Sequence, residues 1–138
     1  GMVFAGNSYD WQAMLAIRLA GARGDVTDTA QVAWKLNRLT PYVSSPLLYD
    51  NTLYFLRHNQ NILSRLDPAT GRPRGEPLRI EGIRDIFASP VGAAGRIYLT
   101  GRDGVTVVLR HEGDKGDNGI LAVNRLDDVF SASAALVG

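Results

Sequence analysis

Residues 45–55 read Ser-Pro-Leu-Leu-Tyr-Asp-Asn-Thr-Leu-Tyr-Phe, and they decide the fold because a second version of them begins 44 residues later. Residues 89–99 read Ser-Pro-Val-Gly-Ala-Ala-Gly-Arg-Ile-Tyr-Leu, which keeps the Ser-Pro start and the tyrosine between apolar residues. A third copy starts another 44 residues on, at Ser133-Ala134-Ala135-Leu136. Repetition at this period indicates one supersecondary unit used several times.

The unit from residue 41 to residue 82 has the pattern of four β-strands. Its apolar residues fall in short, partly alternating runs at 43–48, 52–56, 62–66 and 77–80. Runs of this length with aromatic and β-branched residues favour strands over helices. The connections carry turn chemistry: Asp50-Asn51 suits a tight hairpin, 58–61 is a polar tip, and Asp67-Pro68-Ala69-Thr70-Gly71 has an early proline and a late glycine.

A second full unit, from residue 85 to residue 127, repeats this plan. Its predicted strands are 86–89, 96–100, 105–109 and 120–124. Asp103-Gly104 indicates a two-residue turn, one residue shorter than the equivalent turn of the preceding unit. The best offset between the two units therefore becomes 43 after this turn, and the last connection, 112–119, is longer and more polar than its counterpart.

The two ends of the chain read as incomplete units. Residues 2–38 fit the frame without a first strand: 2–5, 14–19 and 32–36 are the expected second, third and fourth strands, and 20–29 is a surface loop. Residues 131–138 supply a first strand with no successors. The main local alternative is a helix over 10–22, because apolar residues there also show helical spacing.

Four antiparallel strands in about 40–45 residues are typical of a β-propeller blade. The chain is therefore predicted to be all-β, one domain of about three blades in an incomplete propeller. The Ser-Pro start, Leu53-Tyr54-Phe55 and Leu66-Asp67-Pro68-Ala69-Thr70-Gly71 resemble the repeat of the quinoprotein (PQQ-like) β-propellers. The resemblance covers nearly the whole chain, and it is strongest over 44–71 and weakest over 2–19.

The resemblance also implies a tryptophan four residues after the Thr-Gly glycine, which docks between neighbouring blades. In this chain that position is Gly75, so the contact is expected to be missing there. Trp34 stands where such a tryptophan would be in the first unit, and the alternative is a large buried aromatic without that role. Tyr54 and Tyr98 hold equivalent places and are expected to pack in the core or between blades.

The composition is that of an ordinary globular domain. The 138 residues include 15 Lys and Arg, 14 Asp and Glu and no cysteine, which gives a net charge of +1 and excludes disulfides and thiolate chemistry. The charges are interspersed, so neither nucleic acid nor an anionic membrane surface is an expected partner. Gly1 is interpreted as an expression remnant, and 2–6 lacks the features of a signal peptide.

No group of residues in the sequence makes a convincing reaction centre, so no catalytic, cofactor-binding or metal-binding residue is predicted. Asp114, Asp117 and Asn118 miss the spacing of a calcium loop. Asp127 and Asp128 are adjacent and would point to opposite faces of a strand. The remaining candidates are interpreted as surface features: His58 and His111 at predicted tips or strand ends, and the adhesion-like tripeptide Arg23-Gly24-Asp25.

The complementary ends predict an assembly. Residues 131–137 of one copy are expected to pair with 2–5 of another, and a homodimer would close a six-bladed ring; the alternative is a fragment of a longer protein. The resemblance implies two functions. One is a non-catalytic protein-binding scaffold like the outer-membrane-assembly lipoproteins with this repeat, in the periplasm or cell exterior and without cofactor. The other is a piece of a quinone- and calcium-dependent dehydrogenase with its active site elsewhere.

Overall fold

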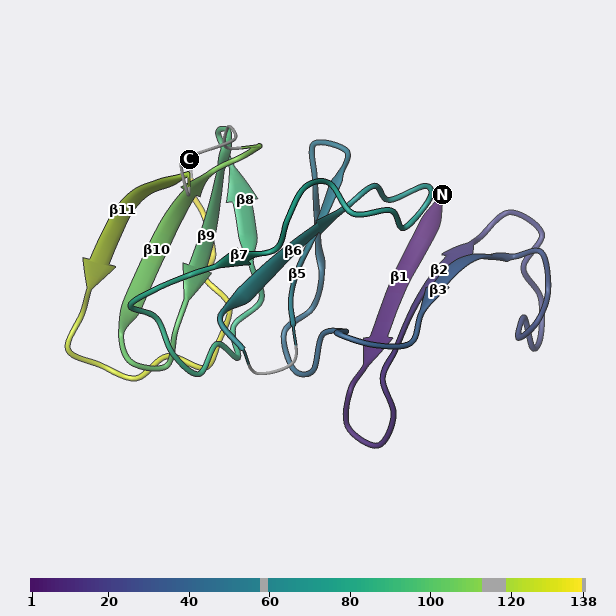
Figure 1. Ribbon diagram of the computed structural model, residues 1–138, viewed down its shortest axis with the longest axis horizontal. Coiled ribbons are helices and arrows are strands. Elements are labelled where there is room, and N and C mark those ends of the chain that lie inside the picture. Colours follow the sequence, from purple (N-terminus) through teal and green to yellow (C-terminus); the bar gives the residue numbers. More distant parts are fainter. Residues whose placement is uncertain (58–59, 113–118, 138) are drawn as a thin grey trace.

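The computed structural model describes residues 1–57, 60–112 and 119–137, and these contain strands and no helix (Figure 1). The strands form three antiparallel sheets, each in sequence order. The first blade consists of β1 (Met2–Asn7), β2 (Ala13–Arg18) and β3 (Val32–Leu36). The second blade consists of β4 (Leu47–Tyr49), β5 (Thr52–Leu56), β6 (Ile62–Leu66) and β7 (Leu78–Arg79). The third blade consists of β8 (Val91–Ala93), β9 (Arg96–Thr100), β10 (Val105–Arg110) and β11 (Ile120–Arg125).

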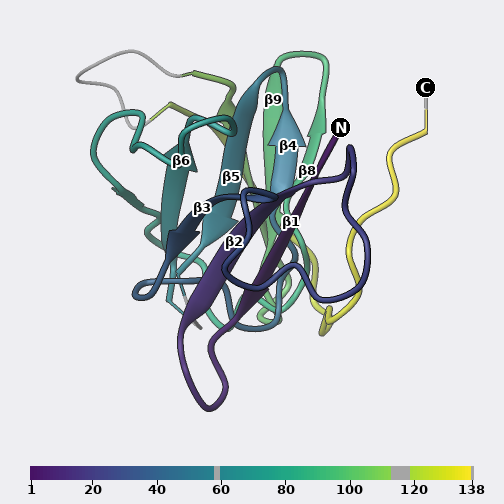
Figure 2. The ribbon, with the colours of Figure 1, turned by 90° about the vertical axis from the view of Figure 1, so that its right-hand side faces the viewer.

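The three sheets stand in a row, with the second blade in the middle, and overlap when viewed from the side of the first blade (Figure 2). This is the arrangement of consecutive blades in an incomplete β-propeller, as the sequence predicts. No stretch of the described chain forms a helix with the length and hydropathy needed to cross a lipid bilayer.

Two apolar layers hold the row together. Between the second and third blades the buried side chains alternate along each strand, so that Tyr54 and Leu56 meet Ile97 and Leu99. Between the first and second blades, Met14 packs with Leu53, Phe55 and Leu66. Fully burying a side chain of this size stabilises a fold by about 1.5–3 kcal/mol, so these layers are the main source of stability.

The hairpin turns confirm the turn chemistry expected from the sequence. Asp50 and Asn51 have φ values of 42° and 58°, and the same two places in the third blade, Ala94 and Gly95, have φ values of 47° and 71°. Two consecutive positive φ angles are those of the type I′ turn that suits a twisted hairpin. Asp103-Gly104 differs from the prediction: Gly101 N donates to Val105 O, so the loop has three residues, with Gly104 left-handed at its end.

In the second blade the first strand is Leu47–Tyr49, later than the 43–48 expected. The first strand of the third blade was predicted wrongly. It is Val91–Ala93 and not 86–89, and it pairs with β9 after the Ser-Pro step, just as β4 follows Ser45-Pro46. Pro90 has no N–H and restricts the residue before it, so a ladder begins beyond it. Ile86 and Ala88 are apolar because they are buried in a loop.

The helical alternative for 10–22 is also wrong. Ala13–Arg18 is a strand that pairs with β1 on one side and with β3 on the other. Its apolar side chains alternate between buried and partly buried, which is the two-residue period of a strand. The partner strands therefore override a spacing that fits a helix equally well.

The 44-residue interval corresponds to a physical link between blades. Ser45 N donates to Ser89 Oγ at 2.9 Å, and Ser89 N donates to Ser133 Oγ at 2.9 Å. Each hydroxyl thus accepts from the serine one blade earlier. We call these three residues the serine ladder. Because Ser133 occupies its third place, the segment that follows it lies where a further blade would begin.

Candidate functional site

The candidate site lies at the joints between blades. Its central element is the turn that follows β6, which both Trp34 and Arg74 contact. Asp67 Oδ1 accepts hydrogen bonds from Ala69 N at 3.0 Å, Thr70 N at 2.9 Å and Thr70 Oγ1 at 2.9 Å. Gly71 N donates to Asp67 O, and Gly71 has a φ of 69°, where a side chain would be strained. The Asp-x-x-Thr-Gly phrase therefore builds a rigid turn.

Trp34 of the first blade docks on this turn of the second blade. Its Nε1 donates to Pro68 O at 2.9 Å, and a Cβ placed on Gly71 would lie 2.7 Å from the indole ring. The ring of Phe4 lies 5.9 Å away, between centroids, on the first-blade side. The structure therefore confirms Trp34 as a docking tryptophan, and Gly71 is required both for its backbone angle and for the space that the indole fills.

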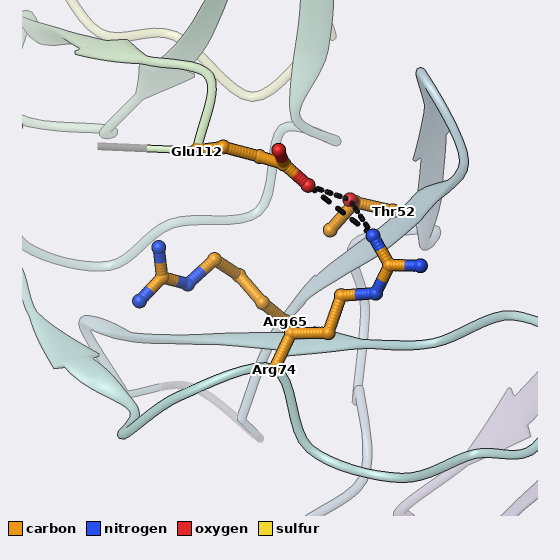
Figure 3. A pocket seen from close by; sticks show the side chains of 4 residues that line it. All are labelled: Thr52, Arg65, Arg74 and Glu112. Atoms are coloured by element: carbon orange, nitrogen blue, oxygen red, sulfur yellow. Dashed lines mark hydrogen bonds and ion pairs between the residues drawn. The ribbon is translucent and has the colours of Figure 1, made fainter. Parts of the chain in front are cut away.

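Between the second and third blades, the contact that corresponds to the docking tryptophan is polar. Gly75 holds the tryptophan position there, as the sequence predicts, and Arg74 next to it makes the contacts (Figure 3). Arg74 donates to Asp67 Oδ2 at 3.0 Å, to Thr52 Oγ1 at 3.0 Å and to Glu112 Oε1 at 3.2 Å. Thr52 Oγ1 also donates to Glu112 Oε1 at 3.0 Å. A charged cluster thus replaces the indole as the link between blades.

The charge pairing between Arg74 and Asp67 shifts the pKa of both groups. The guanidinium of Arg74, followed by the hydrogen bonds from Thr70, holds the pKa of Asp67 below its ordinary value of 3.8. The same pair raises the pKa of Arg74, mainly through the hydrogen bond to Asp67. Each partner therefore stabilises the charged form of the other.

A pocket of about 140 Å³ opens beside the cluster and is lined by Thr52, Arg65, Arg74 and Glu112. In Figure 3, Arg65 extends away from the three bonded residues, and its buried Nε has no hydrogen-bond partner in the described part of the chain. The lining thus contains two guanidinium groups and one carboxylate. The Arg65 guanidinium also lies against Gly75, where an added Cβ would be 3.2 Å from Nη2.

His111 forms a second polar contact across the same joint. Its Nδ1 lies 2.8 Å from Tyr54 Oη, and its Nε2 lies 3.4 Å from Asp50 Oδ2. The ring meets Tyr49 edge-on, with centroids 5.0 Å apart. Burial raises the pKa of Tyr54, so its hydroxyl stays protonated and can serve this hydrogen bond at neutral pH.

The expectation that His111 is an exposed surface residue is therefore wrong, because its side chain is only 11% exposed. A strand end that would be free in an isolated sheet is covered here by the neighbouring blade. Tyr54 packs between blades, as expected, while Tyr98 is half-buried. The offset of 43 was the only signal for His111, since it places residues 111 and 112 at the turn equivalent to 68 and 69.

The other sequence candidates do not join the site. Asp127 and Asp128 are exposed, and Asp128 Oδ1 accepts from Val129 N. Asp25 caps its own turn by accepting from Thr27 N at 2.8 Å. Within residues 1–57, 60–112 and 119–137, no three His, Cys, Asp or Glu side chains are grouped so that they could hold a metal ion. The following candidates lie outside the described residues: His58, Asp114, Asp117 and Asn118.

Comparison with known proteins supports the fold. No protein-family model matches the chain, and no curated protein matches it. Among solved structures, it is similar to a europium-containing methanol dehydrogenase, with a TM-score of 0.61 and 10% sequence identity over 90% of this chain and 23% of that chain. The chain thus spans about a quarter of that protein's length, and at this identity the likeness shows a shared β-propeller fold and nothing more.

Proposed function

We propose that this chain is a non-catalytic β-propeller scaffold that binds protein, as in the outer-membrane-assembly lipoproteins whose repeat it resembles. One observation carries the proposal: the outermost strand, β11, and the residues after it expose a row of apolar side chains. Leu121, Val123, Leu126 and Val129 are between 43% and 65% exposed. Contiguous patches of exposed apolar residues often mark sites of protein interaction.

The edge of β11 adds a second means of binding. Among the described residues it pairs with β10 on one side only, so its other edge has no strand partner in that part of the chain. A partner strand added there would gain main-chain hydrogen bonds and cover the apolar row at once. A net charge of +1 favours a protein over nucleic acid or an anionic membrane as that partner. We propose the periplasm or the cell exterior as the location of this activity, as the resemblance implies.

The charged groups of the site fit a structural role in this proposal. Arg74 bridges Asp67 in its own blade and Glu112 in the next, and His111 bonds Tyr54 across the same joint. Groups held in this way fix the blade angle, and a fixed angle keeps the β11 surface in one shape.

Site-specific photo-crosslinking in the source cells tests the scaffold. A photoreactive residue at Val123 or Val129 is expected to give discrete adducts with other proteins, whereas the same residue at the exposed Glu81 should not. Equal adducts at all three positions would count against a binding surface on β11, because nonspecific collision would then explain them.

The second candidate function is a segment of a quinone-dependent dehydrogenase, and the likeness to a methanol dehydrogenase favours it. In the described residues no three His, Cys, Asp or Glu side chains are grouped to hold a metal ion, so in this reading the calcium ligands would lie on other blades. Adding the quinone with Ca²⁺ to the full-length gene product and recording its absorbance separates the two functions. A saturable spectral shift together with alcohol oxidation would support the dehydrogenase and count against the scaffold function.

A further inference from the structure

Arg65 is a half-buried cation that no acidic side chain neutralises in the described part of the chain. It lies in β6, opposite Tyr54 of β5. Its Nε is buried and has no hydrogen-bond partner among the described residues, and no ion pair there involves it. Buried donors without an acceptor are uncommon in folded proteins, because removing them from water costs free energy that no bond returns. Packing alone therefore does not explain an arginine at this position.

The second arginine of the pocket shows how a structural arginine is bonded at this joint. Arg74 pairs with Asp67 in its own blade and with Glu112 across the joint, so its charge is matched. Arg65 meets neither of these carboxylates, and in Figure 3 it points away from the bonded group. One arginine thus holds two blades together, and the other keeps its donors for a different acceptor.

The outer end of Arg65 is the part that a ligand can reach. Arg65 lines the pocket, and because its Nε is enclosed, the two Nη groups are the donors available there. The N–H bonds of a guanidinium lie in one plane and form a fork that matches the two oxygens of a carboxylate. Arg65 therefore has the geometry for a two-bond contact with a carboxylate in the pocket.

The charge of the lining favours a ligand with a single negative charge. Two guanidinium groups and the carboxylate of Glu112 supply two positive charges and one negative charge, a net charge of +1. A carboxylate balances this charge, whereas a dianion would add repulsion against Glu112. Pockets for drug-sized ligands have volumes of about 300–1,000 Å³. The volume of about 140 Å³ here suits a small group on a short stem.

We propose that the pocket lined by Thr52, Arg65, Arg74 and Glu112 binds one carboxylate group, held by the Nη fork of Arg65 and attracted by the charge of Arg74. The carboxylate belongs either to a small free acid or to an acidic side chain of a bound protein, since both present the same chemistry. The site uses none of the apolar residues of β11. It goes beyond the scaffold function proposed above and does not depend on it.

Nuclear magnetic resonance of isotope-labelled protein tests the site directly. Sodium acetate is added while sodium chloride keeps the ionic strength constant, and the Nε–H resonance of Arg65, assigned by its loss in Arg65→Gln, should shift saturably. Arg65→Lys keeps the charge but loses the fork, so the neighbouring backbone amides should report at least about tenfold weaker acetate binding. The matched control is Arg23→Gln, because Arg23 is exposed and lies in the first blade; its affinity for acetate should be unchanged.

Urea unfolding separates ligand binding from a structural role. Without acetate, Arg65→Gln should unfold at the same urea concentration as the unchanged protein, because Arg65 has no bonded partner to lose in the described part of the chain. With acetate, the unchanged protein and Arg23→Gln should become more stable, and Arg65→Gln should not. A midpoint of Arg65→Gln that is already lower without acetate, with no effect of acetate on the unchanged protein, would identify a structural arginine and overturn the proposal.

Two further probes identify the source and the class of the anion. The first is the blocked peptide acetyl-Gly-Glu-Gly-amide, compared with the same peptide carrying Gln. Binding of the Glu peptide more tightly than acetate would identify a protein side chain as the source, and the reverse order a free acid. Inorganic phosphate should bind more weakly than acetate at the same ionic strength. Phosphate binding as tight as acetate binding, no saturable shift with either carboxylate, or unchanged affinity in Arg65→Lys would overturn the proposal.

Discussion

Replacing Trp34 by alanine is the most direct test of how the blades are joined. The substitution removes the hydrogen bond from Nε1 to Pro68 O, worth about 0.5–1.5 kcal/mol net. It also removes the contacts of the indole with Gly71 and Phe4. Large-to-small changes of buried Trp cost about 3–5 kcal/mol, and Trp34 is only partly buried. We therefore expect a loss of about 3 kcal/mol in the free energy of unfolding, at the lower end of that range.

Urea unfolding followed by far-ultraviolet circular dichroism measures this loss without relying on tryptophan fluorescence. With a slope of about 1–3 kcal/mol per molar urea, the midpoint should fall by about 1–3 M. Trp11→Ala is the matched control, because Trp11 is 72% exposed. Trp34→Phe keeps a ring but loses the N–H, and should cost about 1 kcal/mol through the hydrogen bond. A midpoint of Trp34→Ala within about 0.3 M of Trp11→Ala would refute the docking role.

Three further predictions concern the same turn and cluster. Gly71→Ala should destabilise the chain by at least about 1–2 kcal/mol, through the φ of 69° and the contact with Trp34, and a double-mutant cycle with Trp34→Ala should show coupling and not additivity. Glu112→Gln should lower the free energy of unfolding by less than about 1 kcal/mol and should make the urea midpoint less dependent on salt. A midpoint that depends on salt as strongly as before would contradict the ion pair. Because folding lowers the pKa of Asp67, its contribution to stability is present above 3.8 and is lost as the pH falls through the lowered value; Asp67→Asn should flatten that acid limb.

The sequence predicts this fold well where local signals and the repeat agree. Alternating apolar runs and Asp-Asn or Gly turns locate most strands, and the repeat frame decides for a strand at 13–18, where local spacing also permits a helix. The frame also identifies Trp34, since its position relative to the repeat is informative even though Thr29-Ala30 replaces Thr-Gly before it.

The joint between the second and third blades could not be predicted in the same way. His111 and Glu112 lie near the end of a strand, and only the neighbouring blade decides whether such residues are covered. Arg74 has three partners that are 7, 22 and 38 residues away in the sequence. Spacings of this kind follow no periodicity, so the cluster becomes visible only when the blades are placed in space. The same holds for 86–89, whose apolar residues are explained by burial in a loop and not by pairing.

The two joints between blades differ in how their stability depends on salt. An indole on a glycine joins the first and second blades, and a charged cluster joins the second and third. Apolar contacts tolerate or gain from added salt, whereas exposed ion pairs are weakened by it. In an array where each unit touches only its neighbours, the weaker joint opens first. Tyr54, Leu56, Ile97 and Leu99 belong to the larger of the two apolar layers, so added salt would weaken the second joint only by the small contribution of its ion pairs and would leave the third blade packed on the second.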